Sequence, residues 1–396
     1  MVKQTLSILV MSLRSLPNRL MPTSIIVIGI AGVVAVLLAL LSLASGFEST
    51  LKSTGQDNRA IVLRAGSTSE INGSLSINQY NVIKDLAGVA RANDKKLAAK
   101  ETFVTVNLPK KDNSADASVP MRGISAESFL VRPEVNLVSG RNVELGKHEL
   151  IAGVSAAGQI AGIEVNSTLM IRGVEWKVVG VFSAEGGAFE SELWVDQKLL
   201  AAAWNRGETF SSMLVQLTSS EQFPQFEQQV RSDKRLTANA IRESSFYAEQ
   251  SKTTTGLITA ISLLIGAIMS IGAVFAALNS MYSAISARTT EIATLKALGF
   301  HRAPILLSVL IESALMASIG AVLGGLFVYS TLNGAGVSTA AATSSTFTQI
   351  AFEFMVTPTL LLAGVCLAIA LGLVGGFFPA LHAVRRPIVE GLRVRG

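Results

Sequence analysis

The side chains that could carry catalytic or metal chemistry are few in this sequence, and they lie far apart. The three histidines and the single cysteine are His148, His301, His382 and Cys366. A single cysteine excludes a disulfide within the chain and a cysteine metal cluster. Glu190 and Glu192 are close in sequence, but their strand-and-turn context is typical of a solvated face. The pattern therefore predicts no catalytic residue, no metal site and no bound cofactor.

A nucleotide-binding phosphate loop is also missing from the sequence. Such a loop has the pattern G-x-x-x-x-G-K followed by Ser or Thr, because backbone N–H groups cradle the phosphates and the lysine reaches them. The nearest Gly-Lys pair, Gly146-Lys147, is followed by His148. We therefore expect this chain not to hydrolyse ATP itself.

Four long uncharged stretches dominate the composition. The chain is 49% hydrophobic and 15% charged, whereas a soluble domain normally carries about 25% charged residues. A helix of about 20 apolar residues crosses the hydrocarbon core of a bilayer. Transmembrane helices are predicted at residues 22–45, 256–284, 304–332 and 358–381. The predicted fold is an α-helical membrane protein with four transmembrane helices (1+3) and a mixed α/β extracytoplasmic domain inserted between the first two.

The positive residues predict the orientation of these helices. Lys and Arg occur in residues 1–21, 285–303 and 382–396, whereas the loop 333–357 contains neither. Short cytoplasmic loops are enriched in Lys and Arg. We therefore expect the three basic segments in the cytoplasm, and residues 46–255 and 333–357 in the periplasm beside a cell inner membrane. Anionic lipids explain the net charge of +5 without nucleic acid.

The N-terminus allows an alternative interpretation. Its basic start and apolar run end in Ala44-Ser45-Gly46, which could be the cleavage site of a signal peptide. The apolar run exceeds 20 residues, which favours a retained transmembrane helix. Cleavage would leave the remaining topology unchanged.

Residues 46–255 consist of short apolar segments separated by polar turns, which predicts a mixed α/β domain with one core or two small ones. Strands are predicted at Ala60–Arg64, Thr102–Leu108, Val119–Ile124, Glu149–Gly153, Ser167–Arg172, Val174–Phe182, Glu192–Asp196 and Ser211–Thr218. Helices are predicted at Asn78–Leu86, Gln197–Trp204 and Glu221–Val230. Ser244–Lys252 lacks Gly and Pro, so we expect a helical stalk there; a flexible tether is the alternative.

The loop 285–303 is predicted to contain a short amphipathic helix. Ile292, Leu295 and Leu298 recur every three residues on one side. Gly299 stands where a C-cap glycine is expected, and Pro304 suits the first turn of the next helix. Its charged residues have mixed sign: Arg288, Glu291 and Lys296. Because membrane-surface helices are usually basic, this mixture favours docking into a groove of a soluble partner.

This loop resembles the signature of FtsX/MacB-type ABC transporter permeases. The matching segments are Glu291–Gly299 (EIATLKALG), Ile311–Ala314 (IESA), Gly320–Gly325, Pro379–Pro387 (PALHAVRRP) and Glu390–Arg393 (EGLR). Between the first two predicted membrane helices, four segments are similar to the MacB periplasmic core domain: Gly140-Arg141, Glu149–Gly153, Glu175–Phe182 and Glu190–Asp196. Ala293 stands where the family usually has Gly, and Ser313 interrupts its common Glu-Ala pair.

The resemblance implies a permease subunit that couples to a separate cytoplasmic ABC ATPase, since the ATPase domain fused to MacB is absent from this sequence. Residues implied to couple to the ATPase are Arg288, Glu291, Ile292, Leu295, Lys296, Leu298 and Gly299. It also implies a second permease copy, identical or paralogous, and a possible periplasmic adaptor protein. The work would be mechanotransmission, in which ATPase closure moves the periplasmic domains to export or extract a substrate.

Two glycine pairs predict close helix packing. Gly320 with Gly324 and Gly372 with Gly376 each have the G-x-x-x-G spacing, which permits close backbone approach within one copy or between two. Glu312 is the one ionisable residue well inside a predicted span. A proton or substrate site is one interpretation of such a residue. We favour a structural role, in which the Glu312 side chain reaches the membrane interface or pairs with a nearby arginine.

Other functions are less consistent with the residues. An FtsX-like signalling permease that controls a periplasmic cell-wall hydrolase is the main alternative, and a neighbouring hydrolase gene would favour it. A membrane-anchored enzyme is disfavoured because no Ser/His/Asp set is visible. Secondary transport is disfavoured because the spans contain few polar groups for a midplane binding site.

Overall fold

The computed structural model describes residues 5, 11, 20–111, 116–338 and 350–387 of the chain. Parts of the predicted segments 1–21, 333–357 and 382–396 therefore lie outside the described residues, and so does the tail motif Glu390–Arg393. The chain divides into two compact units. The helical unit comprises Met1–Gly46, Thr254–Ala335 and Phe354–Gly396, and the α/β unit comprises Phe47–Thr253 and Gly336–Glu353.

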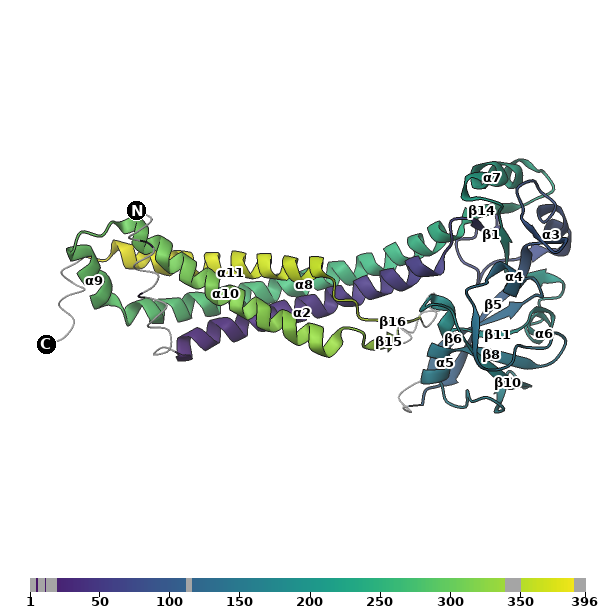
Figure 1. The fold of residues 1–396 in the computed structure, drawn as a ribbon, viewed down its shortest axis with the longest axis horizontal. Coiled ribbons are helices and arrows are strands. Elements are labelled where there is room, and N and C mark those ends of the chain that lie inside the picture. Colours follow the sequence, from purple (N-terminus) through teal and green to yellow (C-terminus); the bar gives the residue numbers. More distant parts are fainter. Residues whose placement is uncertain (1–4, 6–10, 12–19, 112–115, 339–349, 388–396) are drawn as a thin grey trace. The chain divides into compact units, whose positions relative to one another are not determined.

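Four long helices contain the four apolar stretches. They are α2 (Leu20–Thr54), α8 (Glu243–Ser286), α10 (Arg302–Leu332) and α11 (Pro358–Arg385). Each is long and apolar enough to cross a membrane, and each contains the whole of one predicted span. Within the helical unit they run side by side (Figure 1) around a core of buried aliphatic side chains.

The ends and interruptions of these helices follow local chemistry. Pro358 occupies the first turn of α11, where its missing N–H is not needed, and the Leu360 N–H donates to Thr357 Oγ1 (3.3 Å). Pro379 lies inside α11 without ending it, since the helix continues to Arg385. The predicted helical stretch Ser244–Lys252 lies within α8. The flexible-tether alternative is therefore wrong.

The two glycine pairs face neighbouring helices of the same chain. A Cβ at Gly320 would lie 2.7 Å from the carbonyl oxygen of Val27 in α2, and one at Gly324 would meet the backbone of Ala31. A Cβ at Gly372 would lie 2.6 Å from Ala317 Cβ in α10. At Gly376 it would lie 2.7 Å from the side chain of Ser313. We therefore propose that both pairs serve the packing of one copy.

The α/β unit is built on one ten-stranded sheet. Its strands are β1 (Arg59–Arg64), β5 (Ala98–Pro109), β6 (Asp116–Ile124), β7 (Asn136–Gly140), β8 (Glu149–Gly153), β9 (Thr168–Ile171), β10 (Val174–Ser183), β11 (Leu193–Asp196), β13 (Ser212–Gln216) and β14 (Ala238–Arg242). Their order is β14-β1-β13-β5-β6-β11-β8-β10-β7, and β9 also pairs with β10. The β11–β6 and β10–β8 pairs are parallel, and the others are antiparallel.

Helices and short strand pairs complete this unit. The helices are α3 (Ile77–Ile83), α4 (Ser128–Val131), α5 (Val154–Gln159), α6 (Gln197–Ala203) and α7 (Phe223–Ser232), with 3-10 turns η2 (Ala188–Ser191) and η3 (Ser220–Gln222). The short pairs are β2 (Leu75–Ser76) with β12 (Thr209–Phe210), and β3 (Arg91–Ala92) with β4 (Lys95–Lys96). All eight predicted strands and all three predicted helices overlap an observed element.

The sheet supports two separate hydrophobic cores. One lies around β6, β8, β10 and β11, with Trp176 completely buried. The other lies around β1, β13 and β14 and includes Phe226 of α7. Figure 1 shows α7 beside β14, and α6 and α5 near β11 and β8. Of the two predicted arrangements, one core or two small ones, the structure has the second.

The segment between α10 and α11 forms a strand pair that belongs to the α/β unit. In it, β15 (Gly336–Ser338) pairs with β16 (Ala351–Glu353). The Ala351 N–H donates to Ser191 Oγ (2.7 Å), and the Phe352 ring lies 5.4 Å from that of Phe47. The composition of residues 333–357 predicts only a loop here. The strands were not predicted, because each is only three residues long.

Candidate functional site

The chain between α8 and α10 forms the short helix α9, Thr289–Ala297. Just beyond it, Gly299 has a φ of +88°, a conformation that favours glycine. The Gly299 N–H donates to the carbonyl of Lys296 and the Phe300 N–H to that of Leu295, both at 3.1 Å. This pair of hydrogen bonds is a Schellman motif. The predicted C-cap role of Gly299 is confirmed, and the chain turns sharply there toward α10.

The inner side of α9 is packed against the helical unit. Ile292 and Ala293 are buried, and Ile292 shares a core with Ile305 of α10. Arg288, just before α9, places Nη1 2.9 Å from Glu312 Oε2 in α10, with 10% of each side chain exposed. The expected pairing of Glu312 with a nearby arginine is therefore confirmed. Removing either charge would leave the other buried without this ion pair.

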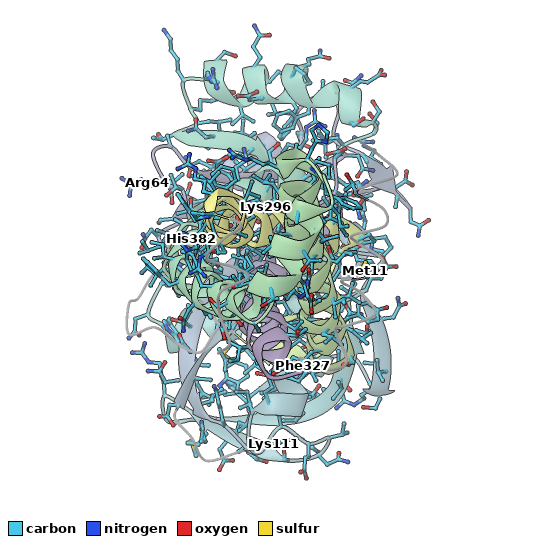
Figure 2. All side chains as sticks on the ribbon, turned by 90° about the vertical axis from the view of Figure 1, so that its left-hand side faces the viewer. Met11, Arg64, Lys111, Lys296, Phe327 and His382 are labelled. Carbon is cyan, nitrogen blue, oxygen red and sulfur yellow. The ribbon has the colours of Figure 1, made fainter. Side chains whose placement is uncertain are left out.

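Lys296 fastens α9 to the end of α11. Its Nζ donates to the carbonyls of Val384 (3.0 Å) and Arg386 (2.6 Å). The last carbonyls of a helix lack intrahelical partners and attract cations. Burial lowers the pKa of Lys296, and the charge of Arg302 adds to this effect. Figure 2 labels Lys296 and His382, and His382 in turn contacts Arg386 at 3.1 Å. A displacement of α9 must therefore displace the ends of both α10 and α11.

The outer side of α9 is a small exposed surface. We call it the α9 outer face; its members are Thr290, Glu291, Thr294, Ala297 and Leu298. Leu298 is 71% exposed, more than any other large apolar residue in the described part of the chain. An acidic, a hydroxyl and an apolar group on one short helix form a surface that can insert into a groove of another protein.

The predicted apolar side of α9 is not a single face. Ile292 is buried, Leu295 is half-buried and Leu298 is exposed. Three residues turn an α-helix by about 60° less than a full revolution, so two such steps rotate the side chains by about 120°. The three apolar residues therefore follow a line around the helix that begins in the core, at Ile292, and ends on the α9 outer face, at Leu298. Among the implied coupling residues, Arg288, Ile292 and Lys296 hold α9 in place, whereas Glu291 and Leu298 lie on its outer face.

A cavity of about 400 Å³ opens beside α9. Its walls come from the end of α8, from α9 and from the start of α10, and Met11, labelled in Figure 2, also lines it. The lining is mostly apolar, with Arg288 and Glu312 as its buried charged residues. Leu295 and Leu298 are also among the lining residues. A cavity of this size and character can receive apolar side chains.

In the α/β unit, the end of α2 is fastened to the start of α8. We call this contact the helix clasp; its residues are Gly55, Gln56, Arg59, Glu243 and Ser244. A Cβ at Gly55 would lie 2.6 Å from Ser244 Cα, so only glycine permits this approach. The Gln56 N–H donates to Glu243 Oε2 (3.0 Å), and Arg59 Nε lies 3.5 Å from the same oxygen. The two helices are therefore held together at these ends.

Five charged side chains are buried in the middle of the sheet. This buried charge cluster consists of Glu70, Glu101, Arg122, Arg132 and Glu192. Arg122 of β6 lies 2.9 Å from Glu70, 2.7 Å from Glu101 and 2.7 Å from Glu192. Arg132 hydrogen-bonds to Glu101 as well. The sequence does not predict this cluster; its one local signal is Arg122 within the otherwise apolar strand Val119–Ile124.

The cluster makes the α/β unit sensitive to acid. Burial by itself would raise the pKa of Glu101, but the charges of Arg132 and Arg122 outweigh burial and hold this pKa below its usual value. A carboxylate with a lowered folded-state pKa stabilises the fold above its unfolded pKa. That contribution is lost as the pH falls through the lowered pKa.

The expectation that Glu190 and Glu192 lie on a solvated face is wrong. Both are buried. Glu190 accepts hydrogen bonds from Ser183 Oγ (2.8 Å) and the Ala184 N–H (2.8 Å), and Glu192 pairs with Arg122 and accepts from Trp194 Nε1 (2.7 Å). The counter-charge of Glu192 is Arg122, 70 residues away, which the local sequence cannot reveal. The hydrogen-bond donors to Glu190 are instead neutral groups within seven residues of it. Among the described residues, no three His, Cys, Asp or Glu side chains are grouped as metal ligands would be.

Two family models match the chain. The MacB-like periplasmic core domain matches residues 23–233, and the FtsX-like permease C-terminal domain matches residues 263–388. The first covers more than half of the chain. Between them the two models contain α2 from Thr23 onward, most of the α/β unit, part of α8, and the whole of α9, α10 and α11.

Curated relatives are similar over parts of their length. The uncharacterized ABC transporter permease YknZ of Bacillus subtilis is 25% identical over 69% of this chain and 64% of its own. The macrolide export ATP-binding/permease protein MacB 1/2 of Paracoccus denitrificans is 24% identical over 79% of this chain and 47% of its own. MacB of Nitrobacter winogradskyi is 33% identical over 39% and 21%. The chain therefore spans less than two thirds of each of these relatives.

Two solved structures are similar to part of the chain. The periplasmic region of MacB from Actinobacillus actinomycetemcomitans is 14% identical with a TM-score of 0.37, over 51% of this chain and 94% of that one. The extracellular domain of the noncanonic ABC-type transporter YknZ from Gram-positive bacteria is 17% identical with a TM-score of 0.36, over 46% and 100%.

Proposed function

Because the chain belongs to the ABC transporter permeases with a MacB-like periplasmic core domain and an FtsX-like permease domain, we propose that it transmits mechanical work across the cell inner membrane. A separate cytoplasmic ATPase binds α9 and hydrolyses ATP. The helices carry the displacement to the α/β unit in the periplasm. There the movement drives the export or extraction of a substrate.

The observation that carries this proposal is the two-sided character of α9. Its inner side is fixed by the Arg288–Glu312 ion pair and by Lys296 at the end of α11. Its outer face exposes Leu298 and Glu291. To transmit force, α9 needs a rigid attachment to the helical unit on one side and an exposed surface for the ATPase on the other. Helix-in-groove docking provides such a contact.

The order of the elements supports opposite locations for α9 and the α/β unit. Helix α9 precedes α10, and the β15–β16 pair, which belongs to the α/β unit, follows α10. Helix α10 has 31 residues, and a helix of that length at about 1.5 Å per residue exceeds the hydrocarbon thickness of a bilayer. We propose that α9 is cytoplasmic, that the α/β unit is periplasmic, and that two permease copies act together, with a periplasmic adaptor as a further partner.

The Leu298→Asp variant tests the docking of the ATPase. Placing a carboxylate in an apolar groove is expected to cost about 2 kcal/mol or more, which is roughly thirtyfold in the dissociation constant. The measurement is the amount of ATPase subunit that co-purifies with the tagged full chain from native membranes in mild detergent. Met170→Asp, at a residue 60% exposed in the α/β unit, is the control and should retain the ATPase. Full retention by Leu298→Asp would exclude α9 as the docking element.

A further inference from the structure

Another cavity, of about 460 Å³, lies in the α/β unit where two parallel strands end. Strands β6 and β11 are parallel neighbours, and Ile124 at the end of β6 pairs with Asp196 at the end of β11. We call the cavity the sheet-end cleft; the lining residues that decide its chemistry are Tyr80, Lys100, Ser125, Glu127, Leu145 and Leu199. The carboxyl ends of parallel strands are where open α/β sheets commonly bind ligands.

The walls of the sheet-end cleft are fixed by contacts of their own. Figure 1 shows α3 and α6 on the same side of the sheet. On the α3 wall, Tyr80 packs against the core around β1 and β13, and its hydroxyl donates to the carbonyl of Ala98 (3.1 Å). On the α6 wall, Asp196 accepts from the N–H groups of Leu199 and Gly146, both at 3.0 Å. The cleft is therefore formed before any ligand enters, as small-molecule sites usually are.

Two opposite charges face the sheet-end cleft without neutralising each other. Lys100 and Glu127 are half-buried, and neither forms an ion pair with any residue in the described part of the chain. The Lys100 ammonium lies 4.9 Å from the centre of the Tyr80 ring. Burial raises the pKa of Tyr80 to about 12, and the charge of Glu127 adds to this rise. The cleft thus offers one ammonium and one carboxylate near the same ring.

A hydroxyl group and apolar surface complete the lining. The Ser125 Oγ is buried and has no hydrogen-bond partner among the described residues. A hydroxyl can both donate and accept, and buried polar groups are almost always paired, so this atom indicates a partner from outside the chain. Leu145, 46% exposed, and Leu199 add apolar side chains. The lining can therefore contact the charged, polar and apolar parts of one ligand.

We propose that the sheet-end cleft binds a small zwitterion of the short-peptide type. The ligand carboxylate lies at Lys100, its ammonium lies at Glu127, and its apolar part lies against Leu145 and Leu199. A purely anionic ligand would be repelled by Glu127 and a purely cationic one by Lys100. The volume lies within the range of small-molecule sites. This inference deepens the proposed function by naming a substrate class, and it rests on that function for the role of the ligand as substrate.

A set of capped peptides tests the site. The probe is the tripeptide Ala-Leu-Ala with free termini, compared with its N-acetylated and its C-amidated forms. Saturation-transfer NMR titrations with the detergent-solubilised full chain give the dissociation constants. Because each cap removes one charge-assisted contact, each is expected to raise the dissociation constant by about tenfold.

Two variants assign each terminus to its side chain. Lys100→Met should raise the dissociation constant of the free peptide by about tenfold, but should leave that of the amidated peptide unchanged, since that peptide has no terminal carboxylate. Glu127→Gln should weaken the free peptide in the same way and leave the acetylated peptide unchanged. Lys177→Met, at an exposed lysine of β10 outside the cleft, is the control and should bind all three peptides as the parent chain does.

The outcomes separate this inference from the proposed function. Absence of saturable binding by the free peptide would overturn it, and so would equal binding of the free and capped forms. Equal weakening of free and amidated peptides by Lys100→Met would also overturn it, because that result indicates a general disturbance of the fold. ATPase co-purification with the same variants reports the docking of α9 independently of the cleft. Failed peptide binding with retained ATPase therefore contradicts only this inference.

Discussion

Arg122→Ala is expected to lower the free energy of unfolding of the α/β unit by about 3–5 kcal/mol, because it leaves buried carboxylates without their shared counter-charge. Arg122 contacts Glu70, Glu101 and Glu192, and all of these side chains are buried. Arg132 remains, but it hydrogen-bonds to Glu101. Two of the three carboxylates then lose their arginine.

Tryptophan fluorescence provides a selective measurement of this effect. The three tryptophans of the chain, Trp176, Trp194 and Trp204, all lie in the α/β unit. Urea unfolding of the detergent-solubilised full chain, followed by this signal, therefore reports that unit. Arg231→Ala is the control: Arg231 pairs with Glu227 at 2.6 Å, and 73% and 35% of the two side chains are exposed. An exposed pair of this kind contributes little to stability. Equal losses in the two variants would mean that Arg122 does not act through burial of charge.

Glu312→Ala is expected to destabilise the helical unit by about 3–5 kcal/mol, because Arg288 stays buried after its partner carboxylate is removed. Loss of an ion pair is especially costly for a charged group at a membrane span. The same change should release α9 from α10. We therefore expect reduced coupling to the ATPase as well as reduced heat resistance.

A double variant separates charge pairing from other effects of this substitution. Replacing a whole buried ion pair by apolar residues of similar size is often neutral, so Arg288→Met with Glu312→Met should recover most of the lost stability. The fraction of detergent-solubilised protein that stays monodisperse after heating measures the helical unit, whose tryptophan-free helices are silent in fluorescence. If the double variant is as unstable as Glu312→Ala, uncompensated charge is not the cause.

The helices and most strands could be predicted because their signals are local. Uncharged runs define α2, α8, α10 and α11, and runs of β-branched residues mark strands such as β10. The short strands β7 and β14 were missed. Over only five residues, the composition of each is too close to that of a polar loop. Both strands form by pairing with strands distant in sequence.

The energetically important contacts could not be predicted because their partners are far apart in sequence. Arg122 meets residues 52 and 70 positions away, and Lys296 reaches carbonyls 88 and 90 residues away. No periodicity encodes such pairs. Glu192 is an example: its neighbours in the sequence indicate a surface position, but in the fold it is buried beside Arg122. For α9, the sequence indicated a partner-binding helix, but only the fold distinguishes its fixed side from its outer face.

Cysteine accessibility tests most directly whether α9 and the α/β unit face opposite compartments, as the transmission of ATPase work requires. Thr290→Cys on the α9 outer face and Arg64→Cys at the exposed end of β1 are each introduced with Cys366→Ala. They are treated with a membrane-impermeant maleimide in spheroplasts and in inside-out vesicles. We expect Thr290→Cys to be labelled only in inside-out vesicles and Arg64→Cys only in spheroplasts. Labelling of Thr290→Cys in intact spheroplasts would place α9 outside the cytoplasm, where no ATPase could bind it.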